Sequence, residues 1–221
     1  MKIKILLLIS SKNKIINLVK KIISNKKNGY SISAICVDSK LKLGNLICLN
    51  TKNEKKENKI LDIIKTKKIN MIISFAYKWI LSEKILNSVN NQTYNIHGAK
   101  ISQYRGNHIS IFPILENKKY TFIELHQMNK FIDSGRVFQS KKIKILSQDT
   151  GETLSEKILK EGCLLLKNFL NKLKNKNFFK KISLKKYINR KIKSKFISNS
   201  SIYKLKKIIN INDKKEIMLK T

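Results

Sequence analysis

Short runs of apolar residues alternate with helix-like segments at the start of the chain, and this alternation constrains the fold more than any other feature. Residues 3–9, 30–37 and 71–75 are mostly apolar, which is typical of strands buried on both faces of a parallel sheet. Residues 14–23 repeat apolar side chains at helical spacing, and residues 52–64 do so after a charged start. This order predicts an α/β fold with a mainly parallel central sheet flanked by helices.

The middle of the chain has a different pattern. Residues 120–128 and 137–146 alternate in the manner of strands, and the turn between them contains Asp133-Ser134-Gly135. This pair predicts an antiparallel addition to the sheet. Residues 92–96 predict another short strand, and residues 151–173 show the periodicity of a long helix.

The composition changes near residue 174. The chain has 221 residues, of which 42% are hydrophobic, enough for one domain with a sizeable core. Residues 174–221 contain 16 basic residues against Asp213 and Glu216. We therefore expect a domain over residues 1–173 and a basic C-terminal tail over residues 174–221 that is helical or partly disordered.

The formal net charge of +34 permits two interpretations. A surface that binds nucleic acid would carry such a charge, but so would a chain shaped by an AT-rich genome. Of the 48 basic residues only Arg105, Arg136 and Arg190 are arginine, although arginine pairs with phosphate in a bidentate manner. The scarcity of arginine favours compositional bias as the main cause and leaves nucleic-acid binding open.

Membrane, secreted and zinc-binding classes are not expected. No stretch of 18 apolar residues is present, so we expect no membrane span. The apolar run at the N-terminus is too short for a signal peptide and better fits a buried strand. Cys36, Cys48 and Cys163 are odd in number and far apart, which predicts reduced thiols in a cytoplasmic protein without a metal site.

Asn95 and His97 are candidates for chemistry because they stand two residues apart in a predicted strand. In an extended segment their side chains lie on the same face, and strand ends of α/β sheets border ligand crevices. An amide beside an imidazole can hold an oxyanion and move a proton. A carboxylate such as Asp133 would orient the ring and favour its protonated form. On spacing alone, a structural histidine is the more common case.

Four short motifs give this pattern a family resemblance. They are Asn95-Ile96-His97-Gly98, Tyr104-Arg105-Gly106, Leu125-His126-Gln127-Met128 and Ile132-Asp133-Ser134-Gly135. Together they resemble the signature of the folate-dependent formyltransferases, including the separation of His97 from Asp133. The resemblance extends from the first strand to about Leu173 and favours catalysis. It implies a Rossmann-like catalytic domain that uses 10-formyltetrahydrofolate as cosubstrate and needs no metal.

The resemblance also implies roles for individual residues. Asn95 and protonated His97 would stabilise the developing oxyanion, and Asp133 would tune His97 and assist proton transfer. The positions matching the folate-binding segments, largely through backbone groups, are Trp79, Ile80, Leu81, Asn129, Lys130, Phe131 and Ile132. Core packing explains Trp79 equally well. Acceptor contacts are expected from Arg105, which stands out because arginine is rare here, and from Gly106 and His108, although a solvated loop role fits His108 equally well. A structural role is expected for His126.

The acceptor amine is the open question. Residues 76–81 and the motif Asp149-Thr150-x-x-Thr153-Leu154 resemble the methionyl-tRNA formyltransferases, which makes initiator methionyl-tRNA the expected partner. A nucleotide-linked amino sugar is the alternative, because residues 185–191 resemble the tail of sugar formyltransferases. Phosphoribosylglycinamide ranks third, since residues 9–14 lack the glycines of a phosphate loop. A degraded folate- or RNA-binding module is the non-enzyme alternative, and the sequence leaves the oligomeric state unknown.

Overall fold

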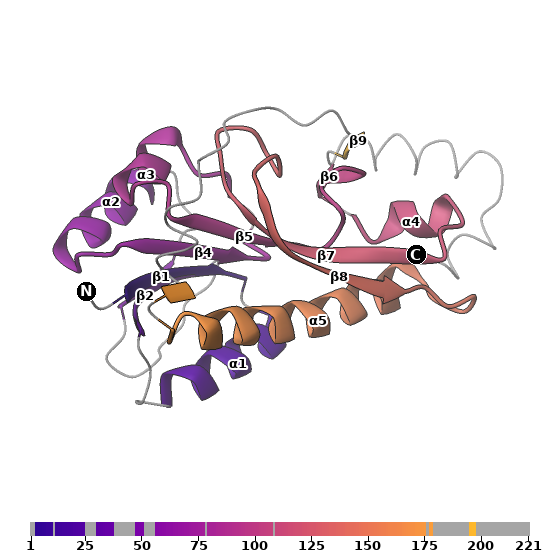
Figure 1. Cartoon of the computed structure of the whole chain (residues 1–221), viewed down its shortest axis with the longest axis horizontal. Coiled ribbons are helices and arrows are strands. Elements are labelled where there is room, and N and C mark those ends of the chain that lie inside the picture. Colours follow the sequence, from indigo (N-terminus) through magenta and orange to yellow (C-terminus); the bar gives the residue numbers. More distant parts are fainter. Residues whose placement is uncertain are drawn as a thin grey trace.

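The computed structural model describes residues 3–10, 12–24, 30–37, 47–50, 56–77, 79–107, 109–175, 177–178 and 195–197, and it forms an α/β domain (Figure 1). The strands are β1 (Ile3–Ile9), β2 (Tyr30–Val37), β3 (Ile47–Asn50), β4 (Met71–Phe75), β5 (Thr93–His97), β6 (Tyr104–Gly106), β7 (Tyr120–Gln127), β8 (Val137–Lys144) and β9 (Lys195–Ile197). The helices are α1 (Asn13–Ser24), α2 (Lys56–Thr66), α3 (Glu83–Ser88), α4 (Ile111–Leu115) and α5 (Gly151–Lys172).

Seven strands form one sheet in the order β3-β2-β1-β4-β5-β7-β8. The first five are parallel, and β7 pairs antiparallel with both β5 and β8. Helices α1 and α5 cover one face of the sheet, and α2 and α3 cover the other (Figure 1). The predicted fold class is confirmed, including the antiparallel addition. Strands β3, β6 and β9 and helix α4 were not predicted.

Strand β1 shows why the first apolar run is continuous. Ile5 and Leu7 belong to the core beneath α1 and α5, whereas Leu6 and Leu8 belong to the core beneath α2 and α3. All four side chains are fully buried. A strand in the middle of a doubly covered sheet needs apolar side chains on both faces, so the run carries no polar alternation.

Helix α5 begins with a capping box that explains one of the sequence motifs. The Thr150 hydroxyl accepts a hydrogen bond from the Thr153 backbone N–H at 3.2 Å, and the Thr153 hydroxyl accepts one from the Thr150 N–H at 2.9 Å. Asp149 pairs with Lys157, eight residues further along the chain, at 2.6 Å. The motif that resembled the tRNA enzymes therefore has a helix-capping role and says little about the acceptor.

Within the predicted tail, residues Lys195–Ile197 form strand β9, whereas a helical or partly disordered tail was expected. It pairs in parallel with β6, matching Tyr104 to Lys195 and Gly106 to Ile197. Most of residues 174–221 lie outside the described residues, so the division into a domain and a tail stays a prediction. Among the helices that the structure describes, none is long and apolar enough to cross a membrane.

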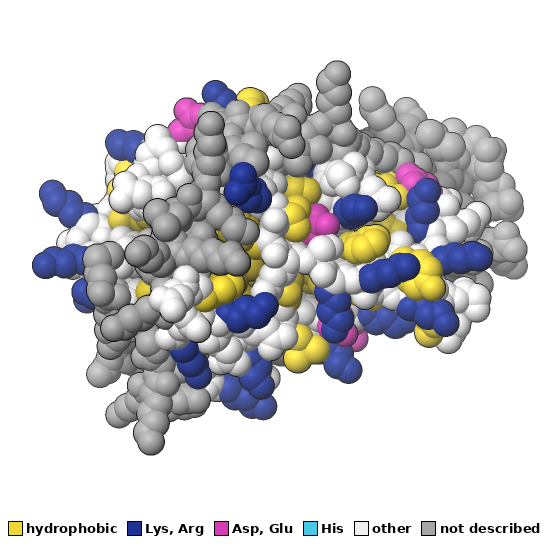
Figure 2. Space-filling view, viewed as in Figure 1, with side chains coloured by type: hydrophobic (Ala, Val, Ile, Leu, Met, Phe, Trp, Pro, Cys, Tyr) yellow, Lys and Arg dark blue, Asp and Glu magenta, His cyan; other side chains and the backbone are white. Residues whose placement is uncertain are grey.

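Lysine and arginine side chains are distributed around the visible face of the molecule (Figure 2), and they do not gather in a single patch there. Two lysines lie beside aromatic rings of β7: Lys142 stands 3.7 Å from the centre of the exposed Tyr120 ring, and Lys100 stands 5.2 Å from that of the half-buried Phe122. This distribution agrees with lysine enrichment spread over an ordinary domain.

Candidate active site

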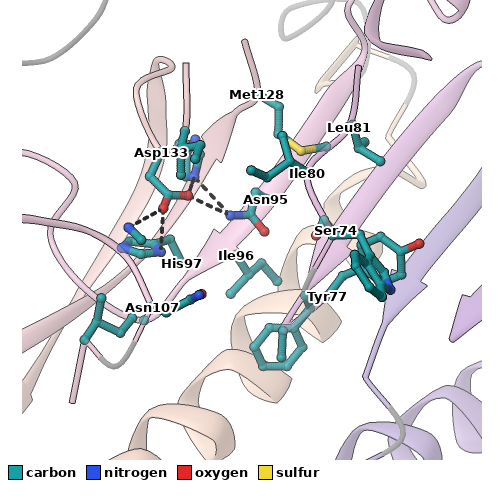
Figure 3. A pocket seen from close by; sticks show the side chains of 18 of the residues that line it. Ser74, Tyr77, Ile80, Leu81, Asn95, Ile96, His97, Asn107, Met128 and Asp133 are labelled. Carbon is teal, nitrogen blue, oxygen red and sulfur yellow. Dashed lines mark hydrogen bonds and ion pairs between the residues drawn. The ribbon is translucent and has the colours of Figure 1, made fainter. Parts of the chain in front are cut away.

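A cavity of about 670 Å³ opens at the carboxyl ends of β4 and β5 (Figure 3). Its wall is built by the segment after β4, by the end of β5, by the loops that follow β6 and β7, and by one face of α5. Strand ends of a parallel sheet leave such a crevice because the chain must turn away from the sheet there. The cavity is where the predicted catalytic residues meet.

Asn95, His97 and Asp133 converge on this cavity (Figure 3). His126 also lines it. The Asn95 Nδ2 donates to Asp133 Oδ1 at 3.2 Å and lies 3.3 Å from His126 Nε2. His97 Nδ1 is 3.5 Å from Asp133 Oδ2, and His126 Nε2 is 3.5 Å from Asp133 Oδ1. One carboxylate thus faces two imidazole rings and one amide.

The two nitrogens of His97 have different partners. Nε2 lies 3.0 Å from the Tyr104 carbonyl oxygen, and since a carbonyl only accepts, Nε2 must carry the hydrogen. Nδ1 is therefore the nitrogen that can gain or lose a proton, and it faces Asp133. The side chain is only 5% exposed, so water does not compete freely for this contact.

Asp133 is held ionised by its surroundings. Burial opposes its charge, but the nearby His97, the hydrogen bond and charge of His126 and the Gly106 N–H outweigh that effect and lower the pKa of the carboxyl well below its usual value. The Gly106 N–H donates to Oδ2 at 2.9 Å. The backbone of Asp133 has φ of 45°, a region that aspartate and asparagine enter more readily than most residues.

The turn around Asp133 is built by its neighbours. The Ser134 hydroxyl donates to the Ile132 carbonyl at 2.9 Å. Arg105 reaches the same turn, with Nη1 3.4 Å from the Ile132 oxygen and 3.3 Å from the Ser134 hydroxyl. Arg105 is 5% exposed and is not among the cavity-lining residues. In this structure the arginine belongs to the framework of the turn, and its expected acceptor contact stays a prediction.

We predict that Gly135→Ala will disrupt this turn. A Cβ at Gly135 would stand 1.6 Å from the Gln127 carbonyl oxygen, so the backbone would have to move. Overpacking of this kind costs about 1–3 kcal/mol, and Asp133 would be displaced with the turn. Urea unfolding should show the loss, whereas Gln148→Ala in an exposed turn should stay within about 0.5 kcal/mol of the parent chain. Equal stability of the two variants would contradict the close approach.

The residues expected to bind folate all line the cavity. They are Trp79, Ile80, Leu81, Asn129, Lys130, Phe131 and Ile132. Trp79 is 41% exposed and Ile80 is 74% exposed, so ordinary core packing does not account for them. Their contact with folate stays a prediction.

The acceptor-binding residues are only partly placed. Gly106 lines the cavity, while His108 lies outside the described residues. Asn107, Ile109 and Ser110 also line the cavity and were not predicted. No group of three or more His, Cys, Asp or Glu in the described part of the chain has an arrangement suited to a metal ion.

Comparisons with known proteins agree with the geometry. The Formyl transferase family model matches residues 2–170. The bifunctional polymyxin resistance protein ArnA of Wigglesworthia glossinidia brevipalpis is 34% identical over 119 residues, 53% of this chain and 18% of that protein. Methionyl-tRNA formyltransferases of Prochlorococcus marinus and a Sulfurihydrogenibium species are 28% and 26% identical, covering 67% and 75% of this chain and 46% and 53% of their own lengths.

Solved structures show the same fold. The phosphoribosylglycinamide formyltransferase of Bacillus halodurans superposes with a TM-score of 0.70 at 20% identity, over 79% of this chain and 96% of that one. A formyltetrahydrofolate deformylase of Pseudomonas syringae also gives 0.70, at 12% identity, over 79% of this chain and 62% of that one. This chain spans about half the length of the methionyl-tRNA formyltransferases it matches. Because the family model covers most of the chain, this protein belongs to the formyl transferase family.

Proposed function

We propose that the protein transfers a formyl group from 10-formyltetrahydrofolate to a primary amine, and that the amine belongs to methionyl-tRNA. The observation that carries the proposal is the meeting of Asn95, His97 and Asp133 at one cavity. Asp133 lies far from Asn95 and His97 in the sequence, so only the fold brings the carboxylate to them. A degraded binding module would have no need to keep a buried, ionised carboxylate opposite an imidazole.

The cavity suits a flat, amphipathic cosubstrate. Apolar side chains of Leu81, Leu86 and Met128 form one part of the wall, and Asp133 with the histidines forms the polar end. About 670 Å³ lies within the range of sites for ligands of this size. When bound, 10-formyltetrahydrofolate supplies an activated formyl group. Trp79 and Ile80 are exposed at this cavity and would lose that exposure against a ring system.

Asp133 and His97 supply the proton chemistry. Because Nε2 of His97 is engaged by the Tyr104 carbonyl, a proton moves through Nδ1 alone, beside Asp133. The carboxylate stabilises the ring when Nδ1 is protonated, and the positive charge of that ring stabilises the negative charge that develops on the formyl oxygen. The acceptor nitrogen gains the bond to the formyl carbon, the bond from that carbon to the folate nitrogen breaks, and the amine proton passes to the released folate nitrogen.

A polyanionic acceptor such as tRNA would be attracted by the positive charge of the chain. A net charge of +34 favours association with RNA and makes it dependent on salt. Two relatives that each cover at least two thirds of this chain are named methionyl-tRNA formyltransferase. The relative at 34% identity carries another name, so a nucleotide-linked amino sugar is retained as the second candidate.

To test the proposal, the full chain is incubated with 10-formyltetrahydrofolate and one acceptor at a time. Mass spectrometry would follow methionyl-tRNA, a nucleotide-linked amino sugar and phosphoribosylglycinamide. We expect N-formylmethionyl-tRNA, with a rate at limiting RNA that falls steeply between about 50 and 200 mM salt.

Each other outcome has a defined meaning. Formylation of the amino sugar or of phosphoribosylglycinamide alone would overturn the tRNA assignment and keep formyl transfer. Product from none of the three, with folate still bound as measured by calorimetry, would favour the binding module.

A further inference from the structure

Glu124 carries a buried carboxyl group that the proton chemistry of His97 and Asp133 does not use. It is 3% exposed and is not among the residues that line the cavity. It lies on β7 directly opposite His97 of β5 in the antiparallel register. The side chains of such a pair lie on the same face of the sheet, with Cβ atoms about 4.5–5.5 Å apart. A carboxyl group buried there needs hydrogen-bond partners in place of water.

Both oxygens of Glu124 have a partner. Oε2 accepts a hydrogen bond from the Ile101 backbone N–H at 2.9 Å, and Oε1 accepts one from the Ser140 hydroxyl at 3.0 Å. Ser140 is the residue paired with Glu124 on the neighbouring strand β8, whereas Ile101 lies in the loop between β5 and β6. Glu124 therefore ties this loop to the sheet beside the strand that carries His97.

The peptide group between Lys100 and Ile101 connects this contact to Tyr104. Its N–H is the group that Glu124 binds, and its carbonyl oxygen accepts the Tyr104 N–H at 3.0 Å. A peptide group is planar, so holding its N–H also fixes the direction of its carbonyl. The Tyr104 carbonyl in turn lies 3.0 Å from His97 Nε2. A series of hydrogen bonds thus runs from Glu124 through the loop to the ring of His97.

We infer that Glu124 is a positioning residue that sets the tautomer of His97 through this loop. Two acceptors compete for the hydrogen of the neutral ring: the Tyr104 carbonyl at Nε2 and the Asp133 carboxylate, 3.5 Å from Nδ1. An ionised acceptor attracts an N–H more strongly than a neutral one does, so Nε2 keeps the hydrogen only while the loop holds the carbonyl in place. Nδ1 is then without a hydrogen and can take the amine proton. That last step rests on the proposed function, but the tautomer does not.

The tautomer can be measured in the folded protein by NMR. The chemical shifts of imidazole nitrogens distinguish a nitrogen that carries a hydrogen from one that does not, and the His97 signals are those that disappear in His97→Ala. At a pH where the ring is neutral, we expect the hydrogen on Nε2 in the parent chain. In Glu124→Leu, which has no acceptor for the Ile101 N–H, we expect it mostly on Nδ1. Glu124→Gln keeps an oxygen for that N–H and an amide for the Ser140 hydroxyl, so the hydrogen should stay on Nε2.

The same variants separate the chemical step from binding. In Glu124→Leu we expect kcat to fall about 10-fold or more, because the proton acceptor is misplaced, while KM for folate changes less than about 3-fold. Glu124→Gln should stay close to the parent chain in both quantities. Ser140→Ala is the matched control, because it removes the donor to Oε1 from an exposed residue and leaves the Ile101 contact in place. Its tautomer and its kcat should be unchanged.

Glu124→Asp covers the case in which Glu124→Leu does not fold. Its side chain is one methylene shorter and no longer makes the 2.9 Å contact with the Ile101 N–H, so the hydrogen should again move to Nδ1. A hydrogen that stays on Nε2 in the folded Leu variant, or otherwise in the Asp variant, would overturn the inference. A Glu124→Gln variant that loses the Nε2 tautomer would do the same. If no acceptor is formylated, the proposed function fails, and the nitrogen chemical shifts alone decide the role of Glu124.

Discussion

His97→Ala should reduce kcat for formyl transfer by about 10²- to 10⁴-fold, the range that a positioned acid–base group contributes. The reason is that Nδ1 of this ring, beside Asp133, is the nitrogen that gains and loses the proton, and no other described side chain occupies its position. The affinity for folate, measured by calorimetry with the formyl-free folate, should change little. The loss would thus appear in the chemical step.

A second variant at His97 separates the hydrogen bond to Asp133 from proton transfer. His97→Asn can place an amide N–H near the position of Nδ1 and so keep a partner for Asp133, but an amide does not titrate in this range. We expect His97→Asn to be nearly as inactive as His97→Ala while unfolding at a urea concentration closer to that of the parent chain.

Thr93→Val is the control for changes on the same strand. Thr93 is fully buried, its hydroxyl has no hydrogen-bond partner within the described structure, and it does not line the cavity. Removal of an unpaired buried hydroxyl is close to neutral, so activity should be retained. Turnover by His97→Ala within 3-fold of Thr93→Val would refute the role of His97.

The sheet was predictable because its central strands are short apolar runs that can be recognised in the sequence. Apart from Lys4 and Ser74, residues 3–9 and 71–75 are apolar on both faces, which is typical of central strands in a parallel sheet. The three residues of β6 and of β9 have no such pattern, since each is too short to show a period and their pairing joins segments 91 residues apart along the register. Pairing of that kind is decided by the packing of the whole chain.

The candidate site was predictable where residue type and spacing matched a family motif, and less so where neighbours across strands decide the role. Asn95, His97 and Asp133 meet as expected. The place of His126 at the cavity was not predicted, because it follows from the β5–β7 register. Alternation with Ile123 and Leu125 already indicated a side chain directed away from the core. Arg105 was assigned to the acceptor because arginine is rare here, and its buried contacts with the turn show how little rarity says about position.

Asp133→Asn should be the other strongly impaired variant, with kcat about 10²- to 10⁴-fold lower. Asparagine has nearly the same shape and also accepts the positive φ of 45° at this turn. It can still accept the Gly106 N–H, so the turn should persist. What disappears is the negative charge that faces His97 and His126, and with it the stabilisation of a protonated ring in a buried site.

The same variant tests the electrostatics through stability. The pKa of Asp133 is lowered in the folded protein, below the ordinary value near 3.9 that it would have when unfolded. The folded state therefore favours the ionised form, and this contribution is fully present above the unfolded pKa and is lost as the pH falls through that value toward the folded pKa. Urea unfolding at pH 7, 5 and 3.5 should show a stability advantage over Asp133→Asn that is largest at the higher pH and narrower at pH 3.5.

If the free energies of unfolding of the parent chain and of Asp133→Asn differed by the same amount at all three pH values, the Asp133 carboxylate would gain nothing from its neighbours in the folded state. In that case the buried charge would not be compensated by His97, His126 and the Gly106 N–H, although the distances of 2.9–3.5 Å place all three next to it. If this difference in free energy of unfolding instead narrows at low pH, and Asp133→Asn has also lost turnover, then stability and catalysis both depend on one ionised carboxylate. The site would then depend on a charge that can be buried only because two imidazoles and a backbone donor surround it.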